Sequence, residues 1–241
     1  MKKTGVLFSI TIAIFVFASG CATLGGNHMT DTVYPIPSYF SFSQGNQWTY
    51  SHKTGDKVGE VTYVIEGYET FHGIKIPKKV QADNPDEYFC TSADSVYGIR
   101  DFKHNLGMTQ EYLIYTPPTN VLPAKMKAGD IHYNAAHLFR HNKDGTIKDE
   151  GSFYDTTILE AVEAVTVPAG RFEDCLKVTL IRDDVFSEIV VNVVLTQWLA
   201  RGVGIVKSNA KVNIYSPQGG EPFTVEASEE LKKATVDGKS Y

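Results

Sequence analysis

Three histidines within ten residues are the first candidates for metal chemistry in this sequence. His137 and His141 have the i, i+4 spacing of a zinc-binding pair on one face of a helix, and His132 lies just before them. The segment that follows, residues 142–145 (N-K-D-G), is typical of a hairpin turn, so we expect a strand here instead. On a strand the two histidines stand about 13 Å apart, too far to bind one ion. We therefore predict no metal site.

Acidic side chains suggest a second kind of site, because calcium prefers clustered oxygen ligands. Asp144, Asp149 and Glu150 lie around Gly145, but they lack the D-x-[DN]-x-[DN]-G spacing, and a solvated turn is the favoured interpretation. The sequence contains neither G-x-S-x-G nor a glycine-rich phosphate loop, and its carboxylates are scattered. We assign no catalytic residue and no cofactor, and we expect a non-enzymatic protein.

The N-terminal segment has the features of an export signal. Lys2 and Lys3 precede an apolar run over residues 6–17, which is shorter than the roughly 20 residues of a membrane span. The run ends in A-S-G-C at Cys21, which resembles the bacterial lipobox, although Ala18 stands where that pattern prefers Leu. The resemblance implies a lipoprotein signal peptide over residues 1–20 and acylation of Cys21, for example by palmitate.

The lipobox resemblance also implies a location and a partner. Ala22 is not the Asp that favours retention in the inner membrane, so we expect a lipid-anchored protein of the bacterial cell envelope, in the outer membrane. The face of the membrane on which it lies stays open. Two or three acyl chains anchor a protein stably without a spanning helix. Residues 21–37, with Gly25, Gly26 and Pro37, are predicted to form the lipidated cysteine and a flexible tether.

The other two cysteines, Cys90 and Cys175, lie in apolar, strand-like surroundings. Export into an oxidising compartment permits a disulfide between them. Two separate buried thiols also fit, because the sequence does not show whether the Cα atoms come within about 6 Å. Both alternatives stay open.

Composition narrows the class of protein. Hydrophobic residues make up 42% of the 241 residues, which is enough for a folded core. The chain has 23 basic and 28 acidic residues, and removal of residues 1–20 changes the net charge from −5 to −7 because it deletes two lysines and no acid. An acidic protein offers no positive electrostatic potential to attract the phosphates of a nucleic acid, so we expect no nucleic-acid partner.

Beyond residue 37 the hydrophobic period is two, which predicts strands. Val206, Ser208, Ala210, Val212 and Ile214 alternate with polar residues, as Leu176, Val178 and Leu180 do in another segment. Gly145, Gly170 and the Gly219–Gly220 pair mark turns. Only residues 228–234 (S-E-E-L-K-K-A) have a helical pattern. We predict a β-rich domain over residues 38–225 and a charged tail, with a short helix, over residues 226–241.

The β-rich domain shows weak internal similarity between residues 39–105 and 121–215. The segment 45–50 (G-N-Q-W-T-Y) corresponds to 129–134, Glu66 to Glu160, and Gly98 to Gly204. If this is a true repeat, each half is an antiparallel meander that cannot bury its apolar face alone. The predicted fold is therefore mainly β, with two similar halves packed as a sandwich or joined in one curved sheet.

Residues 163–178 and 198–207 carry a pattern, V-P-A-G-x-F-x-x-C-L-x-V followed by W-x-A-x-G-V-G-x-V-K, that resembles a family of uncharacterised bacterial lipoproteins. The resemblance implies a β-rich exported domain and no established activity. We expect a binding or interaction module whose partner is an envelope protein or a hydrophobic small molecule. The 28 aromatic residues leave room for an alternative, a periplasmic carrier or sensor that holds a hydrophobic ligand in a cavity. A hydrolase is the third alternative, and it requires a cleft with a strongly perturbed titratable group.

Overall fold

The protein is described here from a computed structural model, which covers residues 31–106, 111–216 and 218–241. Most of these residues form one antiparallel sheet, as the period-two pattern predicts. The strands of this sheet are β2 (Gln47–Thr54), β3 (Lys57–Phe71), β4 (Ile74–Gln81), β5 (Asn84–Asp94), β6 (Gly98–Leu106), β7 (Glu111–Leu122), β9 (Ile131–His141), β10 (Ile147–Val167), β11 (Gly170–Val185), β12 (Val190–Ala200), β13 (Gly204–Tyr215) and β14 (Phe223–Val236). The short β15 (Lys239–Ser240) pairs with the end of β14.

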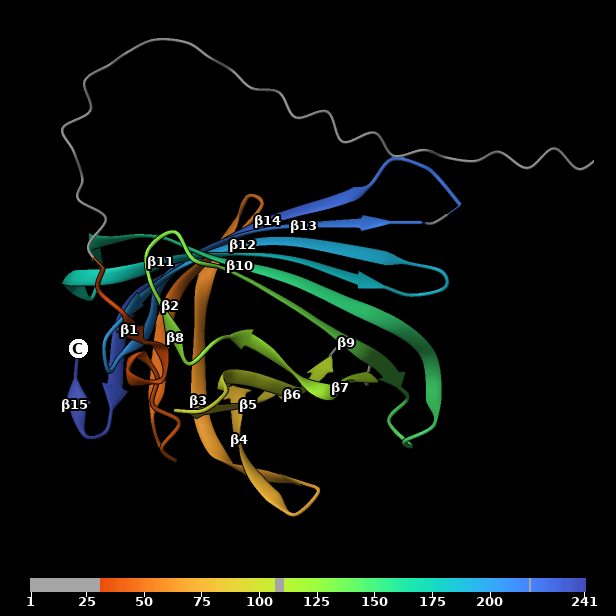
Figure 1. The fold of residues 1–241 in the computed structure, drawn as a ribbon, viewed down its shortest axis with the longest axis horizontal. Helices are drawn as coiled ribbons and strands as arrows, with labels where there is room; N and C mark the ends of the chain where they lie inside the picture. Colours follow the sequence, from red (N-terminus) through yellow and green to blue (C-terminus); the bar gives the residue numbers. More distant parts are fainter. Residues whose placement is uncertain (1–30, 107–110, 217) are drawn as a thin grey trace, which may run out of the picture. The chain divides into compact units, whose positions relative to one another are not determined.

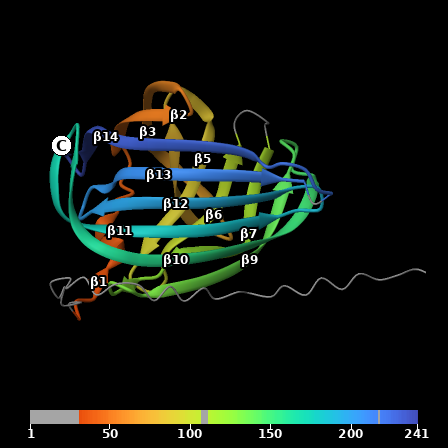
Figure 2. The ribbon, with the colours of Figure 1, turned by 90° about the horizontal axis from the view of Figure 1, so that it is seen from above.

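The twelve long strands close into a barrel. Their order is β13-β12-β11-β10-β9-β7-β6-β5-β4-β3-β2-β14, and β14 pairs with β13 as well as with β2. Figure 1 shows β10–β14 facing β3–β7, and Figure 2 shows the strands of the first group side by side. The expectation of a sandwich or an open curved sheet is therefore wrong. Closure gives backbone partners to both edge strands, which an open sheet would leave unpaired.

The segment that closes the barrel is the one predicted as a helix and charged tail. Residues 228–234 lie within β14, where Ala227 pairs with Thr54 of β2 on one side and with Ala210 of β13 on the other. Leu231 is fully buried in the barrel core. Helix propensity is a weak preference, and strand pairing on both sides overrides it here.

Other sequence predictions at this level are confirmed. Val178 and Leu180 share the buried face of β11, and Val206 and Ser208 share that of β13. Gly170 begins β11 directly after a tight turn, with a φ of 136° that favours glycine.

One end of the barrel is packed. The 3-10 helix η1 (Ile36–Tyr39) lies across this end, between β1 (Tyr34–Pro35), which pairs with β8 (Lys125–Met126), and the turn after β12. Ile36 and Tyr39 pack against the inward-facing Leu159, Leu176 and Leu199. The prediction of a flexible tether up to residue 37 is thus wrong for residues 34–37, because burial of Ile36 fixes this segment to the barrel.

The two halves of the barrel repeat one hydrogen-bond pattern at the positions that the sequence similarity aligns. The N–H of Gly45 donates to the carbonyl of Ile65, and Gly129 donates in the same way to Leu159. A β-bulge follows in each half, at Glu66 and at Glu160. Gly98 and Gly204 begin β6 and β13 with φ values of 96° and 98°. The halves are therefore alike in local structure, while their origin by duplication stays a prediction.

Candidate functional site

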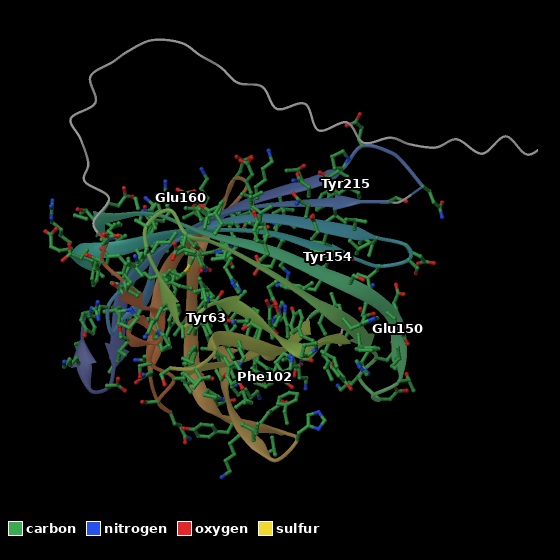
Figure 3. All side chains as sticks on the ribbon, viewed as in Figure 1. Tyr63, Phe102, Glu150, Tyr154, Glu160 and Tyr215 are labelled. Carbon is green, nitrogen blue, oxygen red and sulfur yellow. The ribbon has the colours of Figure 1, made fainter. Side chains whose placement is uncertain are left out.

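The candidate site is a cavity of about 350 Å³ inside the barrel. Successive side chains of a strand point to opposite faces, so every second residue of each strand can reach this space. Its lining is mostly apolar, with a few charged groups, and Tyr63 lies between the facing strands in Figure 3. The principal lining residues are Phe40, Phe42, Trp48, Tyr50, Tyr63, Lys79, Phe89, Thr91, Ile99, Asp101, Val121, Leu180, Arg182, Val193, Leu195, Gln197, Ile205 and Glu229.

Aromatic rings form the part of the cavity next to the packed end. Two of them are fixed by hydrogen bonds to the start of β13 and to the turn before it. The indole Nε1 of Trp48 donates to the carbonyl of Val203 at 2.7 Å, and the hydroxyl of Tyr50 donates to that of Ile205 at 2.8 Å. Both rings are almost completely buried. This wall is therefore preformed, which limits the ordering cost of binding an apolar group.

The cavity is open to solvent away from this wall. Val193, Leu195 and Gln197 of β12 line it and are all only partly buried. A partly hydrated apolar lining is the arrangement that small-molecule sites use, and their volumes range from about 300 to 1,000 Å³.

An arginine brings a fixed positive charge to the cavity. Arg182 of β11 donates from Nε and Nη2 to the two carboxylate oxygens of Asp184, at 3.0 and 2.8 Å, and from Nη2 to the hydroxyl of Tyr115 on β7 at 2.7 Å. The guanidinium also lies 4.7 Å from the centre of the Phe153 ring. The bidentate pair satisfies Asp184 and holds Arg182 in place.

Among the described carboxyl groups inside the barrel (the lumen), Asp155 has the fewest hydrogen-bond partners. It lies directly opposite Arg182 in the β10–β11 pairing, and its side chain is only 4% exposed. Arg182 nevertheless pairs with Asp184, and neither carboxyl oxygen of Asp155 has a hydrogen-bond partner among the described residues. Burial raises the pKa of Asp155 to about 7; Arg182 opposes this shift and the nearby Asp101 adds to it.

A second charged group lies on the opposite side of the cavity. The ammonium of Lys79 lies 4.4 Å from the centre of the Tyr63 ring, and burial lowers its pKa although Glu229 and Asp101 are near. Asp101 accepts one hydrogen bond, from Thr91 Oγ1 at 2.7 Å, and burial raises its pKa. Glu229 accepts from the Tyr63 hydroxyl at 3.2 Å and lies 3.3 Å from His52 Nδ1.

The sequence analysis did not single out these charged residues, although the alternation of inward-facing residues along the strands indicates them. Leu176, Val178 and Leu180 define the inward face of β11, and the same alternation continues to Arg182 and Asp184. Asp155 likewise shares the inward face of β10 with Phe153 and Leu159. Charged residues on the apolar face of a strand are uncommon and mark a site or an ion pair.

The histidines and acids singled out by spacing do not form a joint site. His132, His137 and His141 lie on β9, as predicted, and His141 stacks on Tyr112 at 4.8 Å between ring centres. Asp144 caps the β9–β10 turn by accepting from the Thr146 backbone N–H, and Asp149 accepts from Ser187 Oγ. In the described part of the chain, no three His, Cys, Asp or Glu side chains are grouped to hold a metal ion.

The disulfide that the sequence left open does not form. Cys90 and Cys175 are both free and fully buried. Cys90 packs with Ile76 and Phe102, and Figure 3 shows Phe102 on the far side of β6 from the β10–β14 strands. Cys175 belongs to the cluster around Trp48. Burial raises the thiol pKa of Cys90 to about 12 and that of Cys175 to about 11, which makes both unreactive.

Cys21, the signal peptide and the start of the tether lie outside the described residues. Within the residues that are described, no helix is long and apolar enough to cross a membrane. The lipidation prediction therefore rests on the sequence.

Comparison with known proteins gives a family and two distant structural matches. A family model described as DUF3108-like matches residues 29–213. An inferred exported protein with a YmcC-like fold from Bacteroides fragilis is 16% identical, with a TM-score of 0.44 over 80% of this chain and 96% of the other. An inferred lipoprotein from Parabacteroides distasonis is also 16% identical, with a TM-score of 0.41 over 81% and 97% of the two chains. No curated protein matches the sequence.

Proposed function

The chain belongs to the DUF3108-like family, and we propose that it is a non-enzymatic binding module of the bacterial cell envelope. In this proposal a lipid on Cys21 anchors it to the outer membrane, and the barrel holds an amphipathic small molecule. It is thus a carrier or sensor of a hydrophobic ligand, the alternative that requires a cavity, and not a packed scaffold.

The observation that supports this proposal is the cavity itself. A protein that served only as a scaffold would gain stability by burying this apolar lining, because apolar surface left in contact with water forgoes roughly 25 cal/mol per Å². Here the volume is about 350 Å³, and preformed rings line one side. The combination of an apolar wall with a few charged groups suits a molecule that has an apolar body and a polar head.

The first measurement is native mass spectrometry of residues 22–241, secreted without the lipid, followed by denaturing analysis of any released compound. These residues include every strand of the barrel. A stoichiometric amphipathic compound would support the proposal and would identify the ligand class. A hydrolase, for which Asp155 supplies a perturbed titratable group, would instead release a cleaved product and retain no intact ligand.

Two neighbouring residues of β12 provide a matched test of the cavity. Val193 lines it, whereas Val194 lies on the outer face of the same strand. We expect Val193→Phe to weaken the binding of a fluorescent apolar dye about tenfold or more by filling the cavity, while Val194→Phe binds it like the wild type. Thermal unfolding should first show that both variants fold. Unchanged dye binding by folded Val193→Phe would contradict the proposal.

A further inference from the structure

The chemistry of the ligand's head group can be inferred from the charges around the cavity; this inference rests on the proposed function. Asp101, Glu229, Lys79 and Arg182 line the cavity. Two more carboxyl groups lie beside Arg182: Asp155 opposite it in the β10–β11 pairing, and Asp184 in an ion pair with it. His104 adds no positive charge, because burial lowers its pKa to about 3. The inside of the barrel therefore holds more acidic than basic side chains, although burial raises the pKa of Asp101 and that of Asp155.

Two of the four carboxyl groups already have strong partners. Asp184 makes the bidentate pair with Arg182, and Glu229 is held by Tyr63 and His52. Among the described residues, Asp101 accepts a hydrogen bond from the Thr91 hydroxyl alone, and both buried oxygens of Asp155 lack a partner. A buried carboxyl without hydrogen bonds is destabilising, so a group that donates to it gains free energy on binding.

The aromatic wall favours positive charge. Lys79 shows this directly, since its ammonium lies over the face of Tyr63 at 4.4 Å. The rings of Trp48 and Phe89 line the same space. An anionic head group could pair with Lys79, but it would lie beside Glu229 and Asp101, whose charges act on the Lys79 ammonium.

We propose that the bound molecule carries a protonated amine, which donates hydrogen bonds to Asp155 and Asp101, while its apolar body lies along the aromatic wall. Arg182 and Asp101 line the cavity, and Asp155 lies directly opposite Arg182 in the β10–β11 pairing. The amine takes up the hydrogen-bonding capacity that the protein leaves unused there. The ligand class is a cationic amphiphile.

The test compares dodecylamine, dodecanol and dodecanoate as competitors for an apolar fluorescent dye at neutral pH, below their micelle concentrations, with residues 22–241. We expect dodecylamine to bind at least about tenfold more tightly than dodecanoate, with dodecanol between them. Asp155→Asn should remove most of this preference and leave dodecanol binding unchanged. The control is Asp183→Asn, which removes a charge from the outer face of β11, where Asp183 accepts from Asn192 Nδ2.

The possible outcomes separate three statements: the preference for an amine, the role of Asp155, and the proposed binding function. Equal binding of the three compounds, or tighter binding of dodecanoate, would overturn the amine proposal and leave the cavity as a binding site. Loss of preference in Asp183→Asn as well would show a general charge effect, which also overturns the role of Asp155. If none of the compounds displaces the dye and the dye itself does not bind, both the amine and the proposed function fail.

Discussion

At the scale of single residues, Asp155 is the most informative group of the lumen. It is nearly fully buried, it lies opposite an arginine that pairs with another carboxylate, and its oxygens lack partners within the described residues. Arg182, Asp101 and Asp184 are the charged groups that act on it. Such a residue costs stability in the empty protein, which is a property expected of a binding group and not of a structural one.

The pKa of Asp155 gives a prediction about stability against pH. Because this pKa is about 7 in the folded protein and near 4 in the unfolded chain, folding takes up a proton between these values. The contribution of Asp155 to the free energy of unfolding therefore falls as pH rises from about 4 to 7 and is constant outside that window. Asp155→Asn removes this dependence. The variant should gain on the order of 3–4 kcal/mol relative to wild type across the window, measured by urea unfolding.

The quantity to measure is the difference in the free energy of unfolding between wild type and Asp155→Asn. Neither protein alone isolates the effect of Asp155, because His104 changes stability with pH in the opposite direction. Its pKa is lowered from 6.5 to about 3, so its contribution to stability rises with pH between these values. Both proteins share this effect, and it cancels in the comparison. A difference that stays flat between pH 4 and 7 would show that Asp155 is not protonated in the fold.

At the scale of elements, β14 decides the architecture. It pairs with β2 and with β13, and it brings Glu229 and Leu231 to the inside of the barrel. Without it, β2 and β13 would become edges of an open sheet. The matched region of the family, residues 29–213, ends within β13.

Two adjacent residues of β14 test this role. Leu231→Ala should lower the free energy of unfolding by about 2–5 kcal/mol, because it removes a fully buried side chain from the core. Lys232→Ala, which removes the exposed ion pair with Glu60, should change it by less than about 1 kcal/mol. Urea unfolding measures both. Equal stability of wild type and Leu231→Ala would mean that this segment is a loose tail after all.

At the scale of the whole molecule, the proposal joins a lipid anchor to a ligand-binding barrel. η1 and the short β1–β8 pair fix the chain to the packed end of the barrel from residue 34 onward. The module would thus take its ligand at the membrane surface, where amphiphiles concentrate.

The anchor itself is tested in cells. Cys21→Ser should abolish incorporation of radioactive palmitate, and the protein should leave the membrane fraction or stay uncleaved, because serine offers no thiol for acylation. Val193→Phe serves as the control that keeps the cysteine and its label. Persistent labelling of Cys21→Ser would refute the lipoprotein assignment.

The sequence alone predicted the antiparallel β class and the positions of the main turns. These follow from local rules: Val206 and Ser208 alternate with polar neighbours, and Gly170 occupies a turn that favours glycine. The same alternation also carries Arg182 and Asp155 to the inward face, although the sequence cannot show that one of them is paired and the other is not.

The tertiary structure alone decided the closure of the barrel, the cavity and the states of its charged groups. β14 becomes a strand because two partners far away in sequence offer it hydrogen bonds, against its local helical pattern. Cys90 and Cys175 stay apart because they pack in different clusters. Arg182 pairs with Asp184, two residues along its own strand, and Asp155 has no hydrogen-bond partner in the described part of the chain. The closure of the barrel and the separation of the cysteines depend on contacts between distant segments, which composition and spacing do not encode.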